Sequence, residues 1–197
     1  AEATLGSLGP PNTSRAHLRY YDTLFFLLCQ HGPRARSVLE VGCAEPPFLE
    51  HLTWIPDRTC VAPYRVRYQQ PQANRTDRLP VNHVVADFLR WQSAYKKWDL
   101  VFASQVVEHV KDARRFVRKL IGAGRRTIIS VPYMWNDIFW NIGHKQHNIT
   151  TATFLGWAHP ERPIQTIIVT EDRNGTMSKL QRIVMVFGHD GRKAVTL

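Results

Sequence analysis

One run of the sequence, from Trp98 to Asp112, constrains the fold more than any other. It holds five consecutive apolar or small residues from Leu100 to Ser104, then a polar cluster, then the charged pair Lys111 and Asp112. Such a pattern indicates a buried strand that ends abruptly and presents polar side chains at the edge of a sheet. In an open α/β sheet, ligands bind at the carboxyl ends of the strands. We therefore expect a binding site immediately after this strand.

The rest of the chain alternates between short apolar runs and segments whose apolar residues have helical spacing. Strands are predicted over 37–41, 59–62, 82–86, 99–103 and 127–131. Helices are predicted over 16–30, 47–52, 113–120 and 151–157. Two final runs, 164–169 and 181–187, flank a turn signal at 172–175 and predict an antiparallel hairpin. Strands that alternate with helices and end in a hairpin favour an α/β fold whose sheet is mostly parallel with a reversed edge.

Proline and glycine set the predicted limits of several elements. Pro132 is expected to end the fifth strand, and Gly122 and Gly124 are expected to close the third helix. Residues 1–15 contain few apolar side chains and predict a disordered tail or stem, which leaves 16–197 as a single domain. The chain has no apolar run long enough to span a membrane.

The chain carries a formal net charge of +10, from 26 basic and 16 acidic residues. An excess of this size favours an acidic partner such as an anionic glycan, a nucleic acid or a membrane surface. A solvated positive surface without a partner is the alternative. No block of five or more consecutive basic residues occurs, which argues against nucleic acid.

The three cysteines are too few for a disulfide framework. Cys43 and Cys60 are each expected near the end of a strand, and those strands are expected to be neighbours. A bridge between them is therefore geometrically feasible. We expect buried free thiols instead, because unpaired cysteine behaves as a small apolar core residue.

Four of the seven asparagines lie in Asn-x-Ser/Thr sequons, where chance would give about one. They are Asn12, Asn74, Asn148 and Asn174, all in predicted loops or in the tail. A glycosylation acceptor must lie on a surface loop of a secreted protein. The pattern favours the secretory pathway, either the lumen of the Golgi or ER or the exterior. A cytoplasmic protein with accidental sequons is the alternative.

The run after Asp99 resembles the fourth motif of class I S-adenosylmethionine-dependent methyltransferases, in which an acidic residue and apolar residues precede Glu-His. The segment that begins Glu40-Val41-Gly42 is similar to the family's first motif, acidic-x-Gly-x-Gly-x-Gly. Ala44 and Pro46 replace its second and third glycines. The resemblance covers about 37–131 and implies a Rossmann-like class I methyltransferase fold with helices on both faces of the sheet.

The same resemblance implies S-adenosyl-L-methionine as cofactor. Asp87 and Phe88 match the family residues that bind and flank the adenine, while capping of a short helix is the alternative role for Asp87. The second strand lacks the family's ribose-binding carboxylate, so Tyr64 or backbone groups would have to substitute. The full set of implied cofactor-binding positions is Glu40, Gly42, Cys43, Ala44, Ala62, Tyr64, Asp87, Phe88, Ser104 and Gln105.

The candidate catalytic residues follow the fourth and fifth strands. Methyl transfer to a hydroxyl requires a base that removes the proton, and a histidine with a near-neutral pKa suits this role. His147 is the first choice, followed by His144, His109 and Glu108. A purely structural role of Glu108 and His109 at a helix start is the alternative.

A divalent metal is a second interpretation of these residues. Glu108, His109 and His147 offer oxygen and nitrogen ligands of suitable types. This part of the chain resembles the small-RNA 3′-terminal 2′-O-methyltransferases, which bind a metal through Glu-x-x-Glu-His and a later His. Gln105 stands where the first Glu of that motif would be, so one charged ligand is missing.

Three functions are compatible with these features. The first is O-methylation of a glycan or another hydroxyl acceptor in the secretory pathway. The second is metal-assisted 2′-O-methylation of RNA, or methylation of a small molecule, in the cytosol. The third is a methyltransferase fold that binds without catalysis, which the altered first motif favours. Aromatic residues that could stack on a sugar or base, or form an apolar lid, are Tyr133, Trp135, Phe139 and Trp140.

Overall fold

The computed structural model describes residues 19–43, 48–64, 80–93, 97–135, 143–172 and 179–188. Several sequence-based expectations fall outside these ranges. They concern the tail over 1–15, the loop aromatics Phe139 and Trp140, the residue Ala44, most of the turn at 172–175, and the sequons at Asn12, Asn74 and Asn174. Asn148 is described, and it lies exposed in a loop as expected.

The sheet has seven strands in the order β3-β2-β1-β4-β5-β7-β6. Their bounds are β1 Ser37–Val41, β2 Asp57–Ala62, β3 Asn82–Val85, β4 Trp98–Ser104, β5 Gly124–Tyr133, β6 Gln165–Asp172 and β7 Lys179–Gly188. The first five are parallel, whereas β7 runs antiparallel to both β5 and β6. The predicted parallel sheet with a reversed hairpin edge is confirmed.

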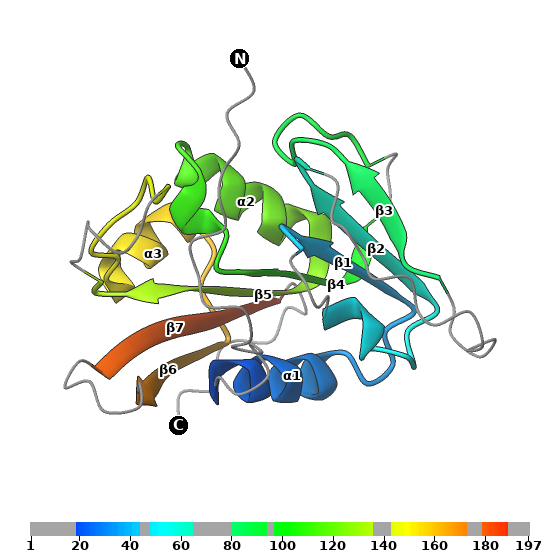
Figure 1. Cartoon of the computed structure of the whole chain (residues 1–197), viewed down its shortest axis with the longest axis horizontal. Coiled ribbons are helices and arrows are strands. Elements are labelled where there is room, and N and C mark those ends of the chain that lie inside the picture. The colour runs from blue at the N-terminus through cyan, green and yellow to red at the C-terminus, as the bar shows by residue number, and fades with distance from the viewer. Residues whose placement is uncertain are drawn as a thin grey trace, which may run out of the picture.

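Helices cover both faces of the sheet (Figure 1). Helix α1 (Arg19–His31) lies on one face, and α2 (Ala113–Ala123) and α3 (Thr151–Ala158) lie on the other. Two single 3-10 turns, η2 (Phe48–Glu50) and η3 (Val107–His109), follow β1 and β4. No helix in the described part of the chain has the length and apolar character needed to cross a bilayer.

Each face of the sheet has its own apolar core, because successive strand residues point to opposite sides. On the α1 face, Leu24 and Leu28 pack with Leu100 and Phe102 of β4. On the other face, a core of α2 and α3 residues packs with the alternate strand positions. Its members include Phe116, Val117, Leu120, Phe154, Val101, Ala103 and Ile129. The central strands are buried on both faces, as expected for parallel strands covered by helices.

Two expectations about the limits of elements are wrong. Helix α2 runs through Gly122 to Ala123 rather than ending there, and Gly124 is the first residue of β5. A Cβ on Gly124 would come within 2.7 Å of a Val101 side-chain atom and 2.8 Å of the Arg126 carbonyl oxygen. Gly124 directly follows the helix in an extended conformation, so it closes α2 as predicted, and its missing side chain also permits close strand packing.

Pro132 does not end the fifth strand, because β5 continues to Tyr133. The pairing of β5 with β4 stops at Ser104 opposite Ser130, while its pairing with β7 continues through Pro132 opposite Arg182. Proline lacks an amide proton, and it is tolerated where a strand has lost a neighbour. Pro132 occupies such a position.

The expectation of free thiols at Cys43 and Cys60 is also wrong, because the two form a disulfide with their Cα atoms 6.0 Å apart. Strands β1 and β2 are neighbours, with Glu40 opposite Cys60. Gly42 then turns the chain with a φ of +81°, and this turn places Cys43 against β2. Cys29 is the free cysteine of the described residues.

Candidate active site

A cavity of about 650 Å³ opens at the carboxyl ends of the parallel strands. It lies where the strand order reverses between β1 and β4, which is the general ligand position in open α/β sheets. Its volume is in the range of small-molecule sites. The strand ends contribute Val41, Gly42, Val61, Pro63, Tyr64, Ala86, Asp87, Phe88, Ser104, Gln105 and Val106.

Gly42 forms the floor of this cavity at the end of β1. Its φ of +81° is in the region that glycine adopts without strain, and a Cβ there would collide with the Val106 side chain. The close approach that the structure shows at this position is that of the Val106 side chain. Of the other first-motif residues, Glu40 and Cys43 are buried and do not line the cavity.

Glu40 is enclosed in the protein interior instead. Burial raises its pKa to about 8, and a hydrogen bond from the Leu49 backbone opposes that shift. One of its carboxyl oxygens, Oε2, has no hydrogen-bond partner among the described residues. The neutral acid is thus the form of Glu40 that the folded chain favours near neutral pH.

The ends of β2 and β3 provide the opposite wall. Tyr64 lines the cavity and is 57% exposed, whereas Ala62 is buried behind it. Asp87 Oδ1 accepts a hydrogen bond from the Leu89 amide at 2.9 Å, and Oδ2 lies 3.7 Å from Arg90 Nε. Asp87 thus caps the turn after β3, which is one of its two alternative roles, and it also lines the cavity. The adjacent Phe88 lies edge-on to the Phe116 ring of α2, at 5.3 Å between centroids.

Ser104 and Gln105 both line the cavity at the end of β4. Gln105 has a φ of 55°, and its Nε2 donates to Ser130 Oγ at 3.3 Å. Ser130 Oγ in turn donates to Ser104 Oγ at 3.2 Å. The Gln105 side chain is therefore directed to β5. Its amide occupies the place of the metal-binding carboxylate in the motif that this part of the sequence resembles.

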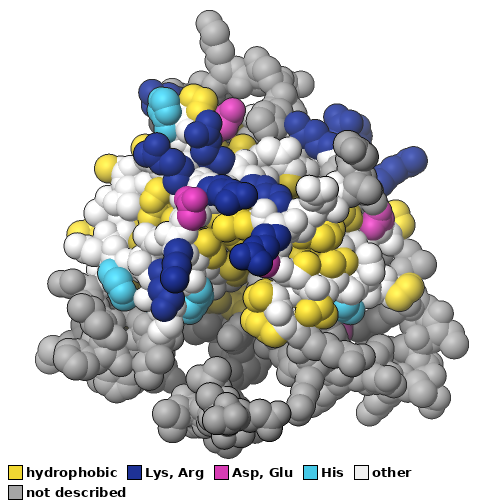
Figure 2. All heavy atoms as spheres, turned by 90° about the horizontal axis from the view of Figure 1, so that it is seen from above, with side chains coloured by type: hydrophobic (Ala, Val, Ile, Leu, Met, Phe, Trp, Pro, Cys, Tyr) yellow, Lys and Arg dark blue, Asp and Glu magenta, His cyan; other side chains and the backbone are white. Residues whose placement is uncertain are grey.

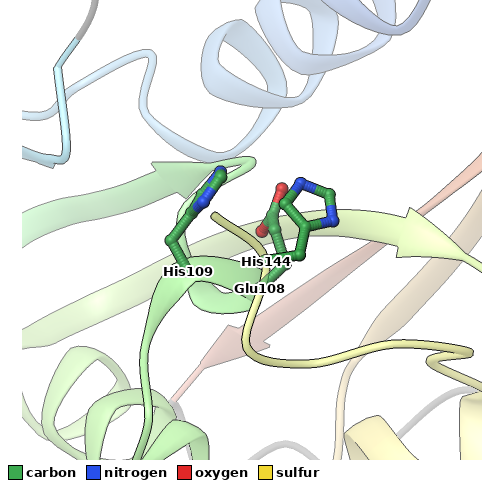
Figure 3. A group of neighbouring side chains, drawn as sticks. All are labelled: Glu108, His109 and His144. Carbon is green, nitrogen blue, oxygen red and sulfur yellow. The ribbon is translucent and has the colours of Figure 1, made fainter. Parts of the chain in front are cut away.

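Glu108, His109 and His144 come together at the other end of the cavity (Figure 3). One ligand atom from each lies within 4.8 Å of the others. Glu108 and His109 belong to η3, and His144 reaches them from the loop after β5. That loop is held in place because the Lys145 and Gln146 amides donate to the Glu108 carbonyl oxygen at 2.6 and 3.0 Å.

Burial decides the charge of these three groups. It raises the pKa of Glu108 to about 8, with the nearby Arg182 cation opposing the shift. It lowers the pKa of His144 to about 4, assisted by His109 and His147. It also lowers the pKa of His109, against a hydrogen bond to the Gly143 backbone. Both imidazoles are therefore neutral at physiological pH and can accept a proton or bind a metal.

His147, the first choice from the sequence, is placed differently. It is exposed, it does not line the cavity, and its ring centroid lies 6.3 Å from that of His144. Glu108, His109 and His144 are the described residues whose ligand atoms lie close enough together to hold an ion, so His144 stands where the sequence interpretation had His147. The reason is local: Gly143 and Asn148 have φ values of 100° and 50°, and the loop between them turns His144 inward.

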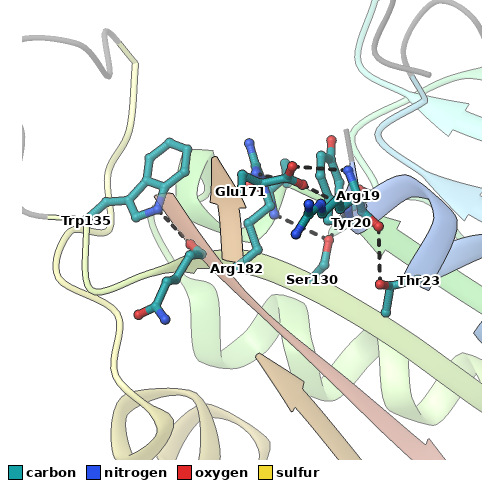
Figure 4. A network of polar contacts seen from close by, with 10 residues as sticks. Arg19, Tyr20, Thr23, Ser130, Trp135, Glu171 and Arg182 are labelled. Atoms are coloured by element: carbon teal, nitrogen blue, oxygen red, sulfur yellow. Dashed lines mark hydrogen bonds and ion pairs between the residues drawn. The ribbon is translucent and has the colours of Figure 1, made fainter. Parts of the chain in front are cut away.

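Sequence reasoning missed one group of residues at the site (Figure 4). Arg182 of β7 lines the cavity between two aromatic rings, 4.1 Å from the Tyr20 centroid and 5.2 Å from that of Trp135. Its Nη1 lies 3.4 Å from Glu171 Oε1, which also accepts from the Tyr20 amide at 2.8 Å. The available signal was a charged residue at a buried position in each strand of the hairpin.

Comparison with known proteins identifies the fold. No protein-family model matches the chain, and no curated protein matches it. Among solved structures, N-methyltransferase NodS from Bradyrhizobium japonicum WM9, in complex with S-adenosyl-L-homocysteine, is similar at 16% identity and a TM-score of 0.64. The match covers 86% of this chain and 85% of that one.

Two further structures have the same architecture. The methyltransferase domain of bacterial CtHen1-CN is similar at 16% identity and a TM-score of 0.59, over 87% of this chain and 98% of that one. Coclaurine N-methyltransferase, bound to N-methylheliamine and S-adenosyl-L-homocysteine, is similar at 11% identity and a TM-score of 0.64, over 84% and 72%. At these identities the likeness shows the fold, which is the predicted class I methyltransferase fold.

Proposed function

We propose that the protein is an S-adenosylmethionine-dependent methyltransferase. The observation that carries the proposal is the cavity at the reversal of strand order, with Gly42 in a left-handed conformation at its floor. The Gly42 backbone, Tyr64, Asp87 and Phe88 would hold the cofactor along the strand ends. Two of the similar structures hold S-adenosyl-L-homocysteine, which supports this choice of ligand. The cofactor supplies a methyl group on a positively charged sulfur.

A hydroxyl is the acceptor that the other end of the cavity suits best. His109 is the candidate base, because a hydrogen bond to the Gly143 backbone orients its ring and its lowered pKa keeps it neutral. In this orientation the second ring nitrogen of His109 is free to take the proton from the hydroxyl that receives the methyl group. Trp135 lines the same cavity, is partly exposed, and offers a flat face on which a sugar ring can pack.

The secretory pathway is the proposed location. The Cys43–Cys60 disulfide supports it, because disulfides persist in oxidising compartments and are rare in the cytosol. The sequon at the exposed Asn148 supports it as well. Together these features favour a luminal or extracellular glycan over a cytosolic acceptor.

The test is methyl transfer from labelled S-adenosylmethionine to a panel of glycans, by the wild type and by two matched variants. We expect His109→Gln to lower the rate by about 100-fold or more, which is the usual contribution of a general base. His147→Gln removes a similar side chain outside the cavity and is expected to leave the rate within about threefold. Equal effects of the two substitutions, or no transfer to any glycan, would contradict the proposal.

Metal-assisted methyl transfer is a second candidate, and one observation favours it. Glu108 Oε2 is buried without a hydrogen-bond partner among the described residues, next to two neutral imidazoles. These residues fit a divalent ion with oxygen and nitrogen ligands, and such an ion would polarise the acceptor oxygen. Loss of activity on chelation and its recovery with Mn²⁺, for an RNA 3′ end or a small molecule, would favour this candidate.

A further inference from the structure

The outward face of helix α2 is rich in basic side chains. From Lys111 to Arg126 the chain has seven basic residues and one acidic residue, Asp112. Helical geometry and burial separate the two faces of α2: Phe116, Val117 and Leu120 are buried, while the arginines point outward. We define the basic face as Lys111, Arg114, Arg115 and Arg118, all of them exposed. Figure 2 shows Lys and Arg side chains gathered on this side of the molecule.

Little in the described part of the chain neutralises this face. Asp112 caps the helix, with its Oδ1 accepting from the Arg115 amide at 3.0 Å. The ion pairs found between described residues involve other cations, namely Arg90, Arg125 and Arg182. Lys119 turns inward, where its Nζ donates to the Phe88 and Trp91 carbonyl oxygens, both at 2.6 Å. Among the described residues, the basic face thus has no ion-pair partner, and its charge is open to a ligand.

The basic face begins at the rim of the cavity. Val110 and Phe116 both line the cavity, so Lys111 and the first turns of α2 border it directly. Gln146, in the loop that carries His144, donates to the Val110 and Lys111 carbonyl oxygens at 2.9 and 3.1 Å. The neighbouring Lys145 is exposed beside His109 and lowers its pKa. A chain lying along α2 would therefore lead to the histidines.

We propose that the basic face binds an anionic glycan chain whose acceptor sugar enters the cavity; this inference rests on the proposed function. Sulfate and carboxylate groups at intervals along a sugar chain match guanidinium groups spaced along one side of a helix. The exposed face of α2 presents no aromatic side chain on which a base could stack, which disfavours single-stranded nucleic acid.

The test is binding of the full chain to size-matched oligosaccharides: a heparin octasaccharide, a polyuronate octamer and neutral dextran, with single-stranded RNA as a further arm. The first variant is Arg114→Gln/Arg115→Gln/Arg118→Gln, in which glutamine keeps the helix propensity. The matched control, Arg34→Gln/Lys97→Gln/Arg162→Gln, removes the same charge from exposed positions outside α2. The single variant Arg118→Gln is the fallback if the triple variant unfolds.

We expect the wild type to bind one of the two anionic glycans and not dextran; which one it binds separates sulfate from carboxylate as the ligand group. The α2 variant should lose about tenfold or more in affinity at about 0.1 M salt, with a shallower dependence on salt, because fewer counterions are released. The control should lose less than about threefold. Arg118→Gln alone should show a smaller loss in the same direction.

Three results would overturn the inference: no binding to either anionic glycan, equal losses in the α2 and control variants, or tighter binding to RNA that depends on α2. Titration of the same proteins with S-adenosyl-L-homocysteine separates this inference from the proposed function. If S-adenosyl-L-homocysteine binds and the glycans do not, only the role assigned to the basic face is wrong. If the glycans bind and S-adenosyl-L-homocysteine does not, glycan binding by the basic face is supported and the methyltransferase proposal is contradicted.

Discussion

Gly42 is the residue at which the backbone of β1 turns away from the cavity. Its φ of +81° and the position of the Val106 side chain leave no room for a Cβ. We expect Gly42→Ala to cost on the order of 1–3 kcal/mol of folding free energy from backbone strain, plus the collision with Val106. We also expect it to abolish binding of S-adenosyl-L-homocysteine. Urea unfolding and calorimetric titration measure the two effects.

The matched control for Gly42→Ala is Gly122→Ala. Gly122 is exposed on α2, and a Cβ there would meet nothing within 4 Å. Alanine in a helix interior is favoured over glycine by about 0.5–1 kcal/mol, so the control should be more stable than the wild type and should bind ligand normally. A destabilised control, or a Gly42 variant of wild-type stability, would contradict this account of the two glycines.

Glu40 predicts a pH dependence of stability. Burial raises its pKa from 4.5 to about 8, so the folded chain holds a proton that the unfolded chain has released. Its contribution is complete below the unfolded pKa of 4.5 and is lost as pH rises toward 8. Glu40→Gln cannot ionise, so its stability relative to the wild type should increase with pH, by up to about 1.4 kcal/mol per unit within that window.

Urea unfolding of both proteins at about pH 5 and about pH 9 makes this comparison. The unfolding free energies of the wild type and of Glu40→Gln should differ least at the lower pH. A difference that is independent of pH would show that Glu40 is ionised in the folded protein.

At the histidines, the structure brings together three of the four candidate residues and leaves the preferred one outside the cavity. Glu108, His109 and His144 were all candidates, yet His147 was preferred. Residue type and spacing do not encode which imidazole of a loop faces inward; the backbone turn between Gly143 and Asn148 decides it. Arg182 escaped notice because its partners Glu171 and Tyr20 are far from it in the sequence or on another element.

Among the elements, the buried strands were predictable and their limits were not. Strand β1 has the predicted bounds of 37–41, because the apolar Val38, Leu39 and Val41 lie between a basic segment at 34–36 and Gly42, which leaves few alternatives. Pro132 gave a misleading signal, since the effect of a proline in a strand depends on which strand lies alongside. Which strands become neighbours depends on residues that are far apart in the sequence, so a local sequence pattern does not reveal it.

The disulfide that joins the ends of β1 and β2 leads to a prediction about stability. The Cys43–Cys60 disulfide closes a loop with a sequence separation of 17, and a loop of that size corresponds to about 3 kcal/mol of stabilisation. Protein secreted from a eukaryotic host should therefore lose about this much unfolding free energy on reduction. Cys29→Ser, which removes the free thiol of α1, should show the same loss on reduction.

Thiol titration of the unfolded protein checks the same link. One reactive thiol is expected before reduction, that of Cys29, and all three after it. Three reactive thiols in protein that was never reduced would contradict the bridge and would weaken the proposed location in the secretory pathway.

For the whole molecule, the sheet order and the two cores place most of the described candidate residues around one cavity at the carboxyl edge of the parallel strands. In the proposed function, the end of the cavity formed by β1 to β4 would take the cofactor. The end formed by η3, the loop carrying His144, and Tyr20, Trp135 and Arg182 would be the acceptor end. The basic face of α2 adjoins the acceptor end. This division of one cavity between a strand-end half and a loop-and-aromatic half is what the methyltransferase proposal requires.

The most direct test of that proposal is calorimetric titration of the protein with S-adenosyl-L-homocysteine. The account predicts binding in the micromolar range, weakened about tenfold or more by Asp87→Ala, whose carboxylate borders the cavity. Thermal unfolding of the variant controls for loss of the turn cap that Asp87 provides. Absence of binding at millimolar ligand would contradict the account and would assign this fold to binding without methyl transfer.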